Sequence, residues 1–206
     1  MKTYTPNMLS DSKGITRTIL DVPFVSQYSI GRDSDGLSRA CGAACVKMIL
    51  DFRGQSVDFR DILREGHTIK GAYISGIGWS QVGLAALLRN HNVGAYGEEF
   101  RAIEVDIENR AFLSSPFEAG HVERGMQKIA GKIIDWQQPV IVSAIKNWRE
   151  IDKPHLVVIT GVEKEGDLIK GFYYNDSDDE DKEGKDCFVD IDTFRRYWRK
   201  FAIFID

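Results

Sequence analysis

The sequence predicts an α+β fold, in which a helical N-terminal part packs on a C-terminal antiparallel sheet. Apolar residues recur at helical spacing in several segments between residues 41 and 136. From residue 140 onward the apolar residues instead form short, nearly continuous runs of the length of β-strands. The turn sequence Glu165-Gly166-Asp167 separates two of these runs and indicates an antiparallel hairpin.

The chain has 206 residues, which suits a single domain with its own hydrophobic core. Residues 1–18 are polar with only scattered apolar residues, so we expect a loose N-terminal arm there. We assign residues 19–206 to one domain, because neither an internal repeat nor a linker divides them.

Charge, cysteine content and hydropathy argue against several classes of protein. The net charge of −4 gives no electrostatic reason to expect binding to nucleic acid or to an anionic membrane. Three cysteines do not suit a disulfide framework, and we expect free thiols. No apolar run approaches the roughly 20 residues that span a bilayer, and residues 1–18 lack the apolar core of a signal peptide. We therefore expect a soluble protein without a membrane span, either cytoplasmic or exported by a non-Sec route.

The helix that begins near residue 41 is the central element of the helical part. Ser38 is its candidate N-cap and Gly54 its candidate stop, and the apolar residues between them form one stripe. Cys41 is therefore placed in the first turn. Further helices are expected at about residues 58–65 with Gly66 as the stop, at 80–90 with Ser80 as the N-cap, at 121–136 and at 192–199.

The strands follow from apolar runs and from the turns between them. Residues 19–26 are strand-like, but Pro23 restricts them to a sheet edge or an extended segment. Residues 156–162 are almost entirely apolar, as expected for a central strand. Residues 71–79 are glycine-rich with aromatic insertions and are a candidate cleft lining. Other strands are expected at about residues 93–100, 140–145, 168–174, 187–191 and 201–205.

Cys41 is the candidate nucleophile. The N-terminus of a helix carries about half a positive charge, which favours a thiolate over a thiol. The alternative interpretation is that Cys41 is a small buried apolar residue without chemistry, as many free cysteines are. Cys41 and Cys45 share one helix face, but no second pair of Cys or His residues at ligand spacing supports a zinc site. Cys45 lies on the apolar stripe and is assigned to the core.

His155 is the candidate general base, because it opens the most apolar strand, a rigid position beside the core. The hairpin turn near Gly166 pairs residues whose numbers sum to about 332, so His155 lies opposite roughly residue 177. Asp176 is thereby brought near His155 and can orient its ring. Asn175 and Asp178 are the nearby alternatives.

Gln27 lies in the polar segment before the helix of Cys41. A side-chain amide there can share an oxyanion with the backbone N–H of Cys41. By itself Gln27 would be interpreted as a surface glutamine. Together, a nucleophile, a base, an orienting carboxylate and an oxyanion donor are the groups that nucleophilic cysteine chemistry requires.

These motifs resemble the peptidase C39-like family, a branch of the papain-like cysteine peptidases. The resemblance rests on the runs VPFVSQ, ACGAA and HLVVITGV, which begin at Val22, Ala40 and His155, and on Asn175-Asp176. It extends from about Leu20 to the C-terminus. The segment 92–138 matches loosely and is interpreted as a divergent or inserted segment.

The resemblance implies a papain-like fold and a bacterial thiol protease that hydrolyses a peptide or amide bond of a peptide or protein substrate. By position, Cys41 would form a thioester acyl-enzyme, with His155 as general base and acid, Asp176 orienting His155, and Gln27 as oxyanion donor. No cofactor and no metal are implied. Asp176-Ser177 departs from the Asp-Pro often found in the family, which removes a rigid turn. Some family members are fused to membrane segments and cut after a double-glycine leader, a specificity not carried over here.

Other interpretations of the same residues stay open. The acyl-enzyme could be resolved by an amine, or the target could be a side-chain amide, which would give an acyltransferase or a deamidase. The chain could also be a non-catalytic peptide-binding module. The carboxylates between residues 176 and 186 could hold calcium, although their spacing is not that of an EF-hand.

Overall fold

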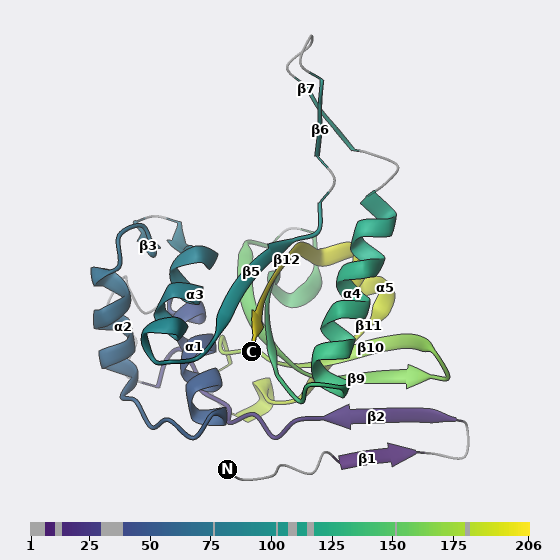
Figure 1. Ribbon diagram of the computed structural model, residues 1–206, viewed down its shortest axis with the longest axis horizontal. Coiled ribbons are helices and arrows are strands. Elements are labelled where there is room, and N and C mark those ends of the chain that lie inside the picture. The colour runs from purple at the N-terminus through teal and green to yellow at the C-terminus, as the bar shows by residue number, and fades with distance from the viewer. Residues whose placement is uncertain are drawn as a thin grey trace.

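A computed structural model of the chain describes residues 7–10, 14–29, 39–75, 77–101, 103–106, 111–114, 118–150, 152–179 and 182–206. Within these residues an eight-stranded antiparallel sheet forms the centre of the molecule, with helices on both of its sides (Figure 1). The predicted α+β class is confirmed, with helices concentrated in the N-terminal half and strands in the C-terminal half.

The strand β9 (Pro154–Glu165) is the central strand of the sheet, as its apolar sequence predicts. It pairs with β10 along one edge, and with β8 and β2 in succession along the other. The strands of this sheet are β1 (Asn7–Ser10), β2 (Ile15–Ile19), β5 (Ala95–Glu99), β8 (Val140–Ile145), β9, β10 (Leu168–Asn175), β11 (Cys187–Asp190) and β12 (Trp198–Ile205).

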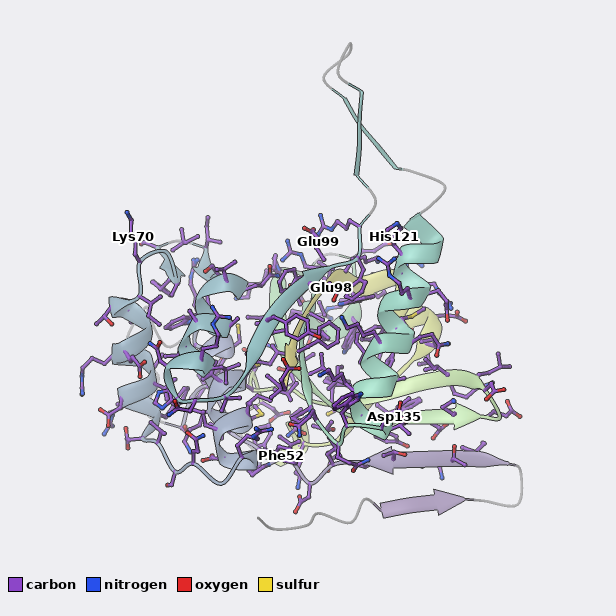
Figure 2. All side chains as sticks on the ribbon, in the orientation of Figure 1. Phe52, Lys70, Glu98, Glu99, His121 and Asp135 are labelled. Atoms are coloured by element: carbon purple, nitrogen blue, oxygen red, sulfur yellow. The ribbon has the colours of Figure 1, made fainter. Side chains whose placement is uncertain are left out.

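Three helices form a group at one side of the sheet, and two more cover it elsewhere (Figure 1). Within the first group, α1 packs directly on β9 and is enclosed by α2 and α3. The helix α4 lies across the other side, where Glu98 of β5 pairs with Lys128, and side chains fill the space beneath it (Figure 2). The helices are α1 (Cys41–Phe52), α2 (Phe59–Thr68), α3 (Gln81–Asn90), α4 (Glu118–Ile134) and α5 (Ile191–Tyr197).

Two small hairpins complete the described chain. The first, β3 (Tyr73–Ile74) with β4 (Gly78–Trp79), lies within the glycine-rich segment between α2 and α3. The second, β6 (Ile103–Asp106) with β7 (Ala111–Ser114), projects from the body of the molecule (Figure 1). In the described part of the chain, no helix is both long enough and apolar enough to cross a membrane.

Within the loose arm predicted for residues 1–18, the described residues 7–10 and 15–18 lie in strands instead. The strands β1 and β2 form a hairpin, and β2 pairs with β9. An ion pair between Arg17 and Glu163, 2.7 Å long, joins the two strands. The sequence signal is weak because only Ile15 and Ile19 of the five residues in β2 are apolar, so the strand shows no apolar–polar alternation. The single domain predicted for residues 19–206 remains a prediction.

The predicted start and end signals of the helices are confirmed in part. The hydroxyl of Ser80 caps α3 by accepting a hydrogen bond from the backbone N–H of Gly83, 3.1 Å away. Gly54 follows α1 with a positive φ of 74°, as a helix stop requires. Ser38 lies outside the described residues, and Ala40 occupies the N-cap position of α1 without a side-chain bond.

Gly66 was predicted to end the second helix, but α2 continues to Thr68 and Gly66 lies inside it. A Cβ atom at position 66 would lie 2.3 Å from Cζ3 of Trp79. The Trp79 ring is held against the rings of His67 and Tyr73, at centroid distances of 5.4 and 5.3 Å. Gly66 is therefore required for close packing of α2 on β4.

We expect Gly66→Ala to destabilise the protein by about 1–2 kcal/mol. The clash with the Trp79 ring costs about 1–3 kcal/mol, and the higher helix propensity of alanine returns at most about 1 kcal/mol. Gly131→Ala in α4 is the matched control, because its Cβ would have only one neighbour, at 3.5 Å, and the variant should be as stable as wild type or more so. Urea unfolding midpoints measure both, and equal midpoints for the two variants would contradict the packing role.

Candidate active site

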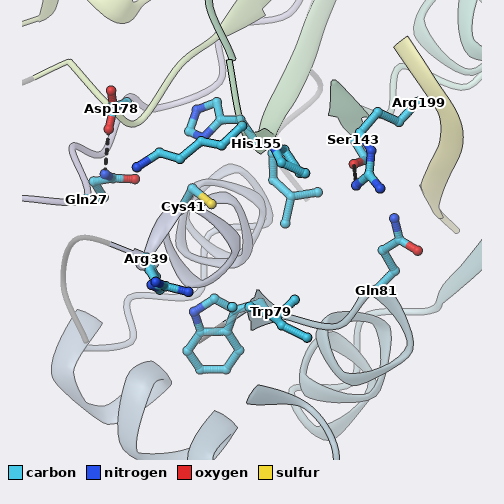
Figure 3. A pocket seen from close by; sticks show the side chains of 14 residues that line it. Gln27, Arg39, Cys41, Trp79, Gln81, Ser143, His155, Asp178 and Arg199 are labelled. Atoms are coloured by element: carbon cyan, nitrogen blue, oxygen red, sulfur yellow. Dashed lines mark hydrogen bonds between the residues drawn. The ribbon is translucent and has the colours of Figure 1, made fainter. Parts of the chain in front are cut away.

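The structure brings the four predicted site residues together from four parts of the chain. Cys41 is the first residue of α1, and His155 is the second residue of β9. Asp176 follows β10, and Gln27 stands in the turn after the extended N-terminal segment. Cys41, His155 and Gln27 line one cavity of about 570 Å³ (Figure 3).

The buried helix α1 positions Cys41. Its residues between Gly42 and Leu50 are almost all buried, and they pack on β9 in the main hydrophobic core. Gly42 allows Trp79 to approach, since a Cβ atom there would lie 2.8 Å from Cβ of Trp79. Cys41 itself remains half-buried at the wall of the cavity, at the end of the helix where the dipole is positive.

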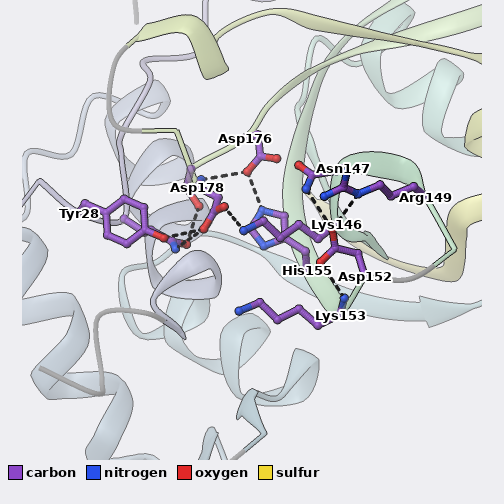
Figure 4. A network of polar contacts seen from close by, with 11 residues as sticks. Tyr28, Lys146, Asn147, Arg149, Asp152, Lys153, His155, Asp176 and Asp178 are labelled. Carbon is purple, nitrogen blue, oxygen red and sulfur yellow. Dashed lines mark hydrogen bonds and ion pairs between the residues drawn. The ribbon is translucent and has the colours of Figure 1, made fainter. Parts of the chain in front are cut away.

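His155 and Asp176 form the central contact of the site. Nε2 of His155 lies 2.6 Å from Oδ1 of Asp176, and the His155 side chain is only 6 % exposed (Figure 4). The same carboxylate oxygen accepts a hydrogen bond from the backbone N–H of Asp178, 2.9 Å away. The proximity that hairpin register predicted for His155 and Asp176 is therefore confirmed. Asn175, one of the alternatives, is turned away and donates to the carbonyl of Val22.

The electrostatics favour a charged imidazole. Burial lowers the pKa of His155, but hydrogen bonds from its ring to Asp176 and Cys41, and the charges of both groups, outweigh burial and raise the pKa to about 10. Burial raises the pKa of Asp176, but the His155 contact, the Asp178 N–H and the charge of Lys146 bring it below its ordinary value. At neutral pH the pair is an imidazolium and a carboxylate.

The other two cysteines are unsuited to nucleophilic chemistry. Cys45 is fully buried in the core, and burial, with the charges of Cys41 and Asp176, raises the pKa of its thiol well above the ordinary value. Burial and three nearby aspartates also raise the pKa of Cys187. Both thiols therefore stay protonated at neutral pH, in agreement with the prediction that Cys45 belongs to the core.

Gln27 is held by a network that sequence reasoning missed. Its Nε2 donates to Oδ1 of Asp178 at 2.7 Å, and its Oε1 accepts from the Ser177 hydroxyl at 3.4 Å (Figure 3). Asp178 also accepts from the hydroxyl of Tyr28 at 2.7 Å and pairs with Lys146 (Figure 4). One of the two amide hydrogens of Gln27 is thus committed to Asp178, and the orientation of the amide is fixed.

Only part of this network could be predicted from the sequence. Asp178 was considered as an alternative to Asp176, but its carboxylate contacts Gln27, Tyr28 and Lys146 instead of His155. Lys146 follows β8 and Tyr28 follows Gln27, and neither belongs to a recognisable motif. A salt bridge between a loop and a distant strand end requires the sheet order, which sequence alone does not supply.

The walls of the cavity come from both halves of the molecule. Ile77, Gly78 and Trp79 of the β3–β4 hairpin line one side, which confirms the predicted cleft lining at residues 71–79. Leu156 and Ser143, on β9 and β8, line the other side. The cavity therefore lies between the helical part and the sheet, with Cys41 on the first and His155 on the second.

The described residues offer no cluster of three or more His, Cys, Asp or Glu side chains that could hold a metal ion. In the described part of the acidic segment, three of the carboxylates have separate protein partners. Asp176 contacts His155, Asp178 contacts Lys146, and Asp186 accepts from the hydroxyl of Thr160 at 3.2 Å. The calcium interpretation of this segment thus has no support in the geometry.

Comparisons with known proteins show which family and fold the chain resembles. A profile of the Peptidase C39 like family matches residues 19–202. Among solved structures, a double glycine motif protease from an AMS/PCAT transporter, in complex with a leader peptide, is 16 % identical with a TM-score of 0.50, over 91 % of this chain and 92 % of that one. The peptidase domain of Streptococcus ComA is 15 % identical with a TM-score of 0.49, over 82 % of this chain and 91 % of that one.

No curated protein matches the chain at a significant level. The family assignment therefore rests on the profile match, which covers most of the chain and contains Gln27, Cys41, His155 and Asp176. The first of the solved structures adds an independent likeness of the fold over nearly its whole length. The chain belongs to the Peptidase C39 like family and has the fold of a cysteine peptidase.

Proposed function

We propose that the protein is a cysteine peptidase that cleaves a peptide or protein substrate through a Cys41 thioester. The observation that carries the proposal is the placement of His155, whose ring bonds Asp176 and which lines one cavity together with Cys41, close enough for the Cys41 side chain to raise the pKa of the imidazole. A non-catalytic peptide-binding module has no need of a buried imidazolium directed at a thiol. Nothing in the geometry favours acyl transfer or deamidation over hydrolysis.

The first half-reaction forms the acyl-enzyme. The Cys41 thiolate, paired with the His155 imidazolium, attacks the carbonyl carbon of the scissile amide, and the carbonyl oxygen becomes an oxyanion. When the tetrahedral intermediate collapses, the C–N bond breaks and His155 gives its proton to the leaving amine. The product is a thioester on Cys41 and a neutral imidazole.

The second half-reaction restores the enzyme. His155, now neutral, takes a proton from a water molecule, whose oxygen attacks the thioester carbon. The C–S bond breaks, the carboxylic acid product leaves, and the thiolate–imidazolium pair forms again. Asp176 keeps the imidazole ring oriented through both steps and stabilises its charged form.

Gln27 and the backbone N–H of Cys41 are proposed as the oxyanion donors. The first N–H groups of a helix have no partner within the helix, so the N–H of Cys41 is available to a ligand. The contact with Asp178 fixes the Gln27 amide and leaves its second N–H for the oxyanion. The ion pair of Asp178 with Lys146 offsets a carboxylate charge that would otherwise repel the oxyanion.

A peptide substrate is supported by one structural neighbour. The double glycine motif protease was solved with a leader peptide bound, and it shares the fold over most of both chains. A cavity of about 570 Å³ that opens beside Cys41 suits a few residues of an extended peptide.

We expect Cys41→Ala to abolish labelling by a neutral chloroacetamide probe at pH 7, whereas Cys45→Ala and Cys187→Ala should label as wild type does. The other two thiols have raised pKa values, so only Cys41 is expected to react quickly. Mass spectrometry of a peptide library, treated with wild type or Cys41→Ala, then tests turnover. Equal labelling of all three variants, or the same products from both proteins, would contradict the proposal.

The charged pair predicts a pH dependence of stability. The folded pKa of His155, about 10, lies above the ordinary 6.5, so its stabilising contribution is complete below pH 6.5 and is lost as the pH rises through 10. We expect wild type to exceed His155→Gln in free energy of unfolding by about 1–3 kcal/mol at pH 6, a value typical of charged hydrogen bonds. The gap should narrow toward pH 10. Denaturant titrations at several pH values measure this difference in the free energy of unfolding. A difference that widens as the pH rises would refute the assignment of His155 as a stabilising imidazolium.

Gln27→Ala separates oxyanion stabilisation from nucleophile activation. Alkylation of Cys41 develops no oxyanion, whereas peptide cleavage does. We expect kcat on a peptide identified by library profiling to fall about 10²–10³-fold, as loss of one oxyanion donor typically causes. Labelling of Cys41 should change much less. Gln55→Ala serves as the control, since Gln55 bonds the carbonyl of His91 away from the cavity. A parallel loss of labelling and cleavage would show that Gln27 acts on the thiol or on the fold instead.

A further inference from the structure

A bulge in β12 directs Arg199 toward the cavity. Trp198 pairs with Ala144 on β8, but the next paired residues are Phe201 and Ser143, so Arg199 and Lys200 are extra residues in the ladder. Lys200 has a φ of 60°, which is rare for a residue with a side chain. Bulges of this kind commonly redirect a side chain beside an active site.

The bulge is held in place by contacts from both flanks. Nζ of Lys200 donates to the carbonyls of Arg195 and Trp198, at 2.7 and 2.8 Å. Nη2 of Arg101 donates to the carbonyl of Arg199 at 3.0 Å. A strained conformation persists only where its surroundings enforce it, and such positions cluster at functional sites.

The guanidinium of Arg199 has no carboxylate partner among the residues that the structure describes. Its Nη1 donates to the hydroxyl of Ser143, at 3.2 Å, and Ser143 is buried. Burial, and then the charge of Arg101, lower the pKa of Arg199, and the charge of Glu99, which forms no ion pair with Arg199, only partly opposes them. By contrast, Arg17 pairs with Glu163 and Arg149 pairs with Asp152. A half-buried cation that forms no close ion pair is costly, and an anionic ligand bound beside it would reduce that cost.

The cavity as a whole carries an excess of positive charge. Arg39 and Lys153 line it together with Arg199, whereas the acid in its lining, Asp178, is already paired with Lys146. Figure 3 shows Arg199, Ser143 and Gln81 at one end of the cavity and Gln27 with Asp178 at the other. The amide of Gln81 faces the Arg199 guanidinium and adds an uncharged donor at that end.

The strand register gives the distance from the catalytic centre. His155 on β9 pairs with Ala144 on β8, and Ala144 pairs with Trp198 on β12. Two strand spacings amount to roughly 10 Å, and Arg199 follows one residue further on. An extended peptide covers roughly 10 Å with about three residues.

We propose that the Arg199 end of the cavity is a subsite for a carboxylate of the peptide substrate, about two or three residues from the scissile bond. The Arg199 guanidinium binds the carboxylate as a charged fork, and the Gln81 amide donates beside it. This inference rests on the proposed peptidase function, because it takes the cavity as the substrate site. It adds a preference for acidic peptides that the catalytic residues do not themselves require.

The test uses chloroacetyl peptides that alkylate Cys41, so that no substrate has to be known. The thiolate displaces chloride, an S–C bond forms as the C–Cl bond breaks, and intact-mass spectrometry gives the rate. One pair of probes is chloroacetyl-Gly-Glu-amide against its Gln analogue, and a second pair carries one further Gly. A fifth probe, with Gln and a free C-terminal carboxylate, distinguishes a side-chain carboxylate from a terminal one.

We expect wild type to react roughly tenfold faster with the better acidic probe than with its neutral analogue, as a charge-assisted hydrogen bond allows. Arg199→Gln should abolish the preference, and Arg199→Lys should keep part of it. Gln81→Glu leaves Arg199 in place but supplies a competing carboxylate at the first position of α3, where acids are tolerated, and should also abolish it. Arg60→Gln, at an exposed position outside the cavity, should leave the ratio unchanged.

The outcomes separate the two proposals. If the neutral probes fail to label Cys41 in wild type, the peptidase function fails. If they label it, but no acidic probe is preferred, the subsite is refuted and the nucleophile stands. A preference that survives in Arg199→Gln, or in Gln81→Glu should Arg199→Gln not fold, would also refute the subsite. The subsite would be refuted as well if Arg60→Gln lost the preference for the acidic probe to the same extent as Arg199→Gln.

Discussion

His155 and Asp176 stand 21 positions apart, and the antiparallel pairing of β9 with β10 brings them within hydrogen-bonding distance. The pairing contains two irregularities. Lys170 is skipped on β10, which moves the register by one residue, and Thr160 is skipped on β9, which restores it. Because a slip of one residue turns a side chain to the opposite face, the second irregularity is what keeps Asp176 on the side of His155.

The pairing of β9 with β10 and the packing of α1 on β9 divide the site between two parts of the molecule. The sheet supplies His155 and Asp176, and the helical part supplies Cys41. Gln27 and Asp178 form a second connection between the same parts, and the backbone N–H of Gln27 also bonds the carbonyl of Ser177 at 2.8 Å. The loop after β10 therefore fixes the proposed general base on one side and the proposed oxyanion donor on the other. Without a proline after Asp176, these bonds hold the turn in place.

The sequence predicted those parts of the fold and site that depend on local pattern. The bounds of β8, the place of Cys41 in the first turn of α1 and the cap of α3 follow from apolar runs, helical spacing and one end signal, and the His155–Asp176 contact follows from one hairpin. Gly66 was misassigned because a glycine that ends a helix and one that admits a neighbouring ring look alike in sequence. The role of Lys146 was not predicted, because its ion pair with Asp178 depends on the order of the strands in the sheet, which the sequence does not give.

The position of Arg199 is a further feature that sequence patterns do not predict. In sequence Arg199 belongs to a basic run that resembles the solvated face of the helix expected at residues 192–199. In the structure α5 ends at Tyr197, two residues before Arg199. What turns Arg199 inward is the bulge opposite Ser143 and Ala144, which no propensity encodes. Because Ala144 is also the partner of His155, one row of paired strands carries both the proposed general base and the Arg199 cation. Their separation is set by strand spacing, which varies far less than the geometry of a surface loop, so a substrate carboxylate bound at Arg199 would hold the scissile bond in a fixed register with Cys41.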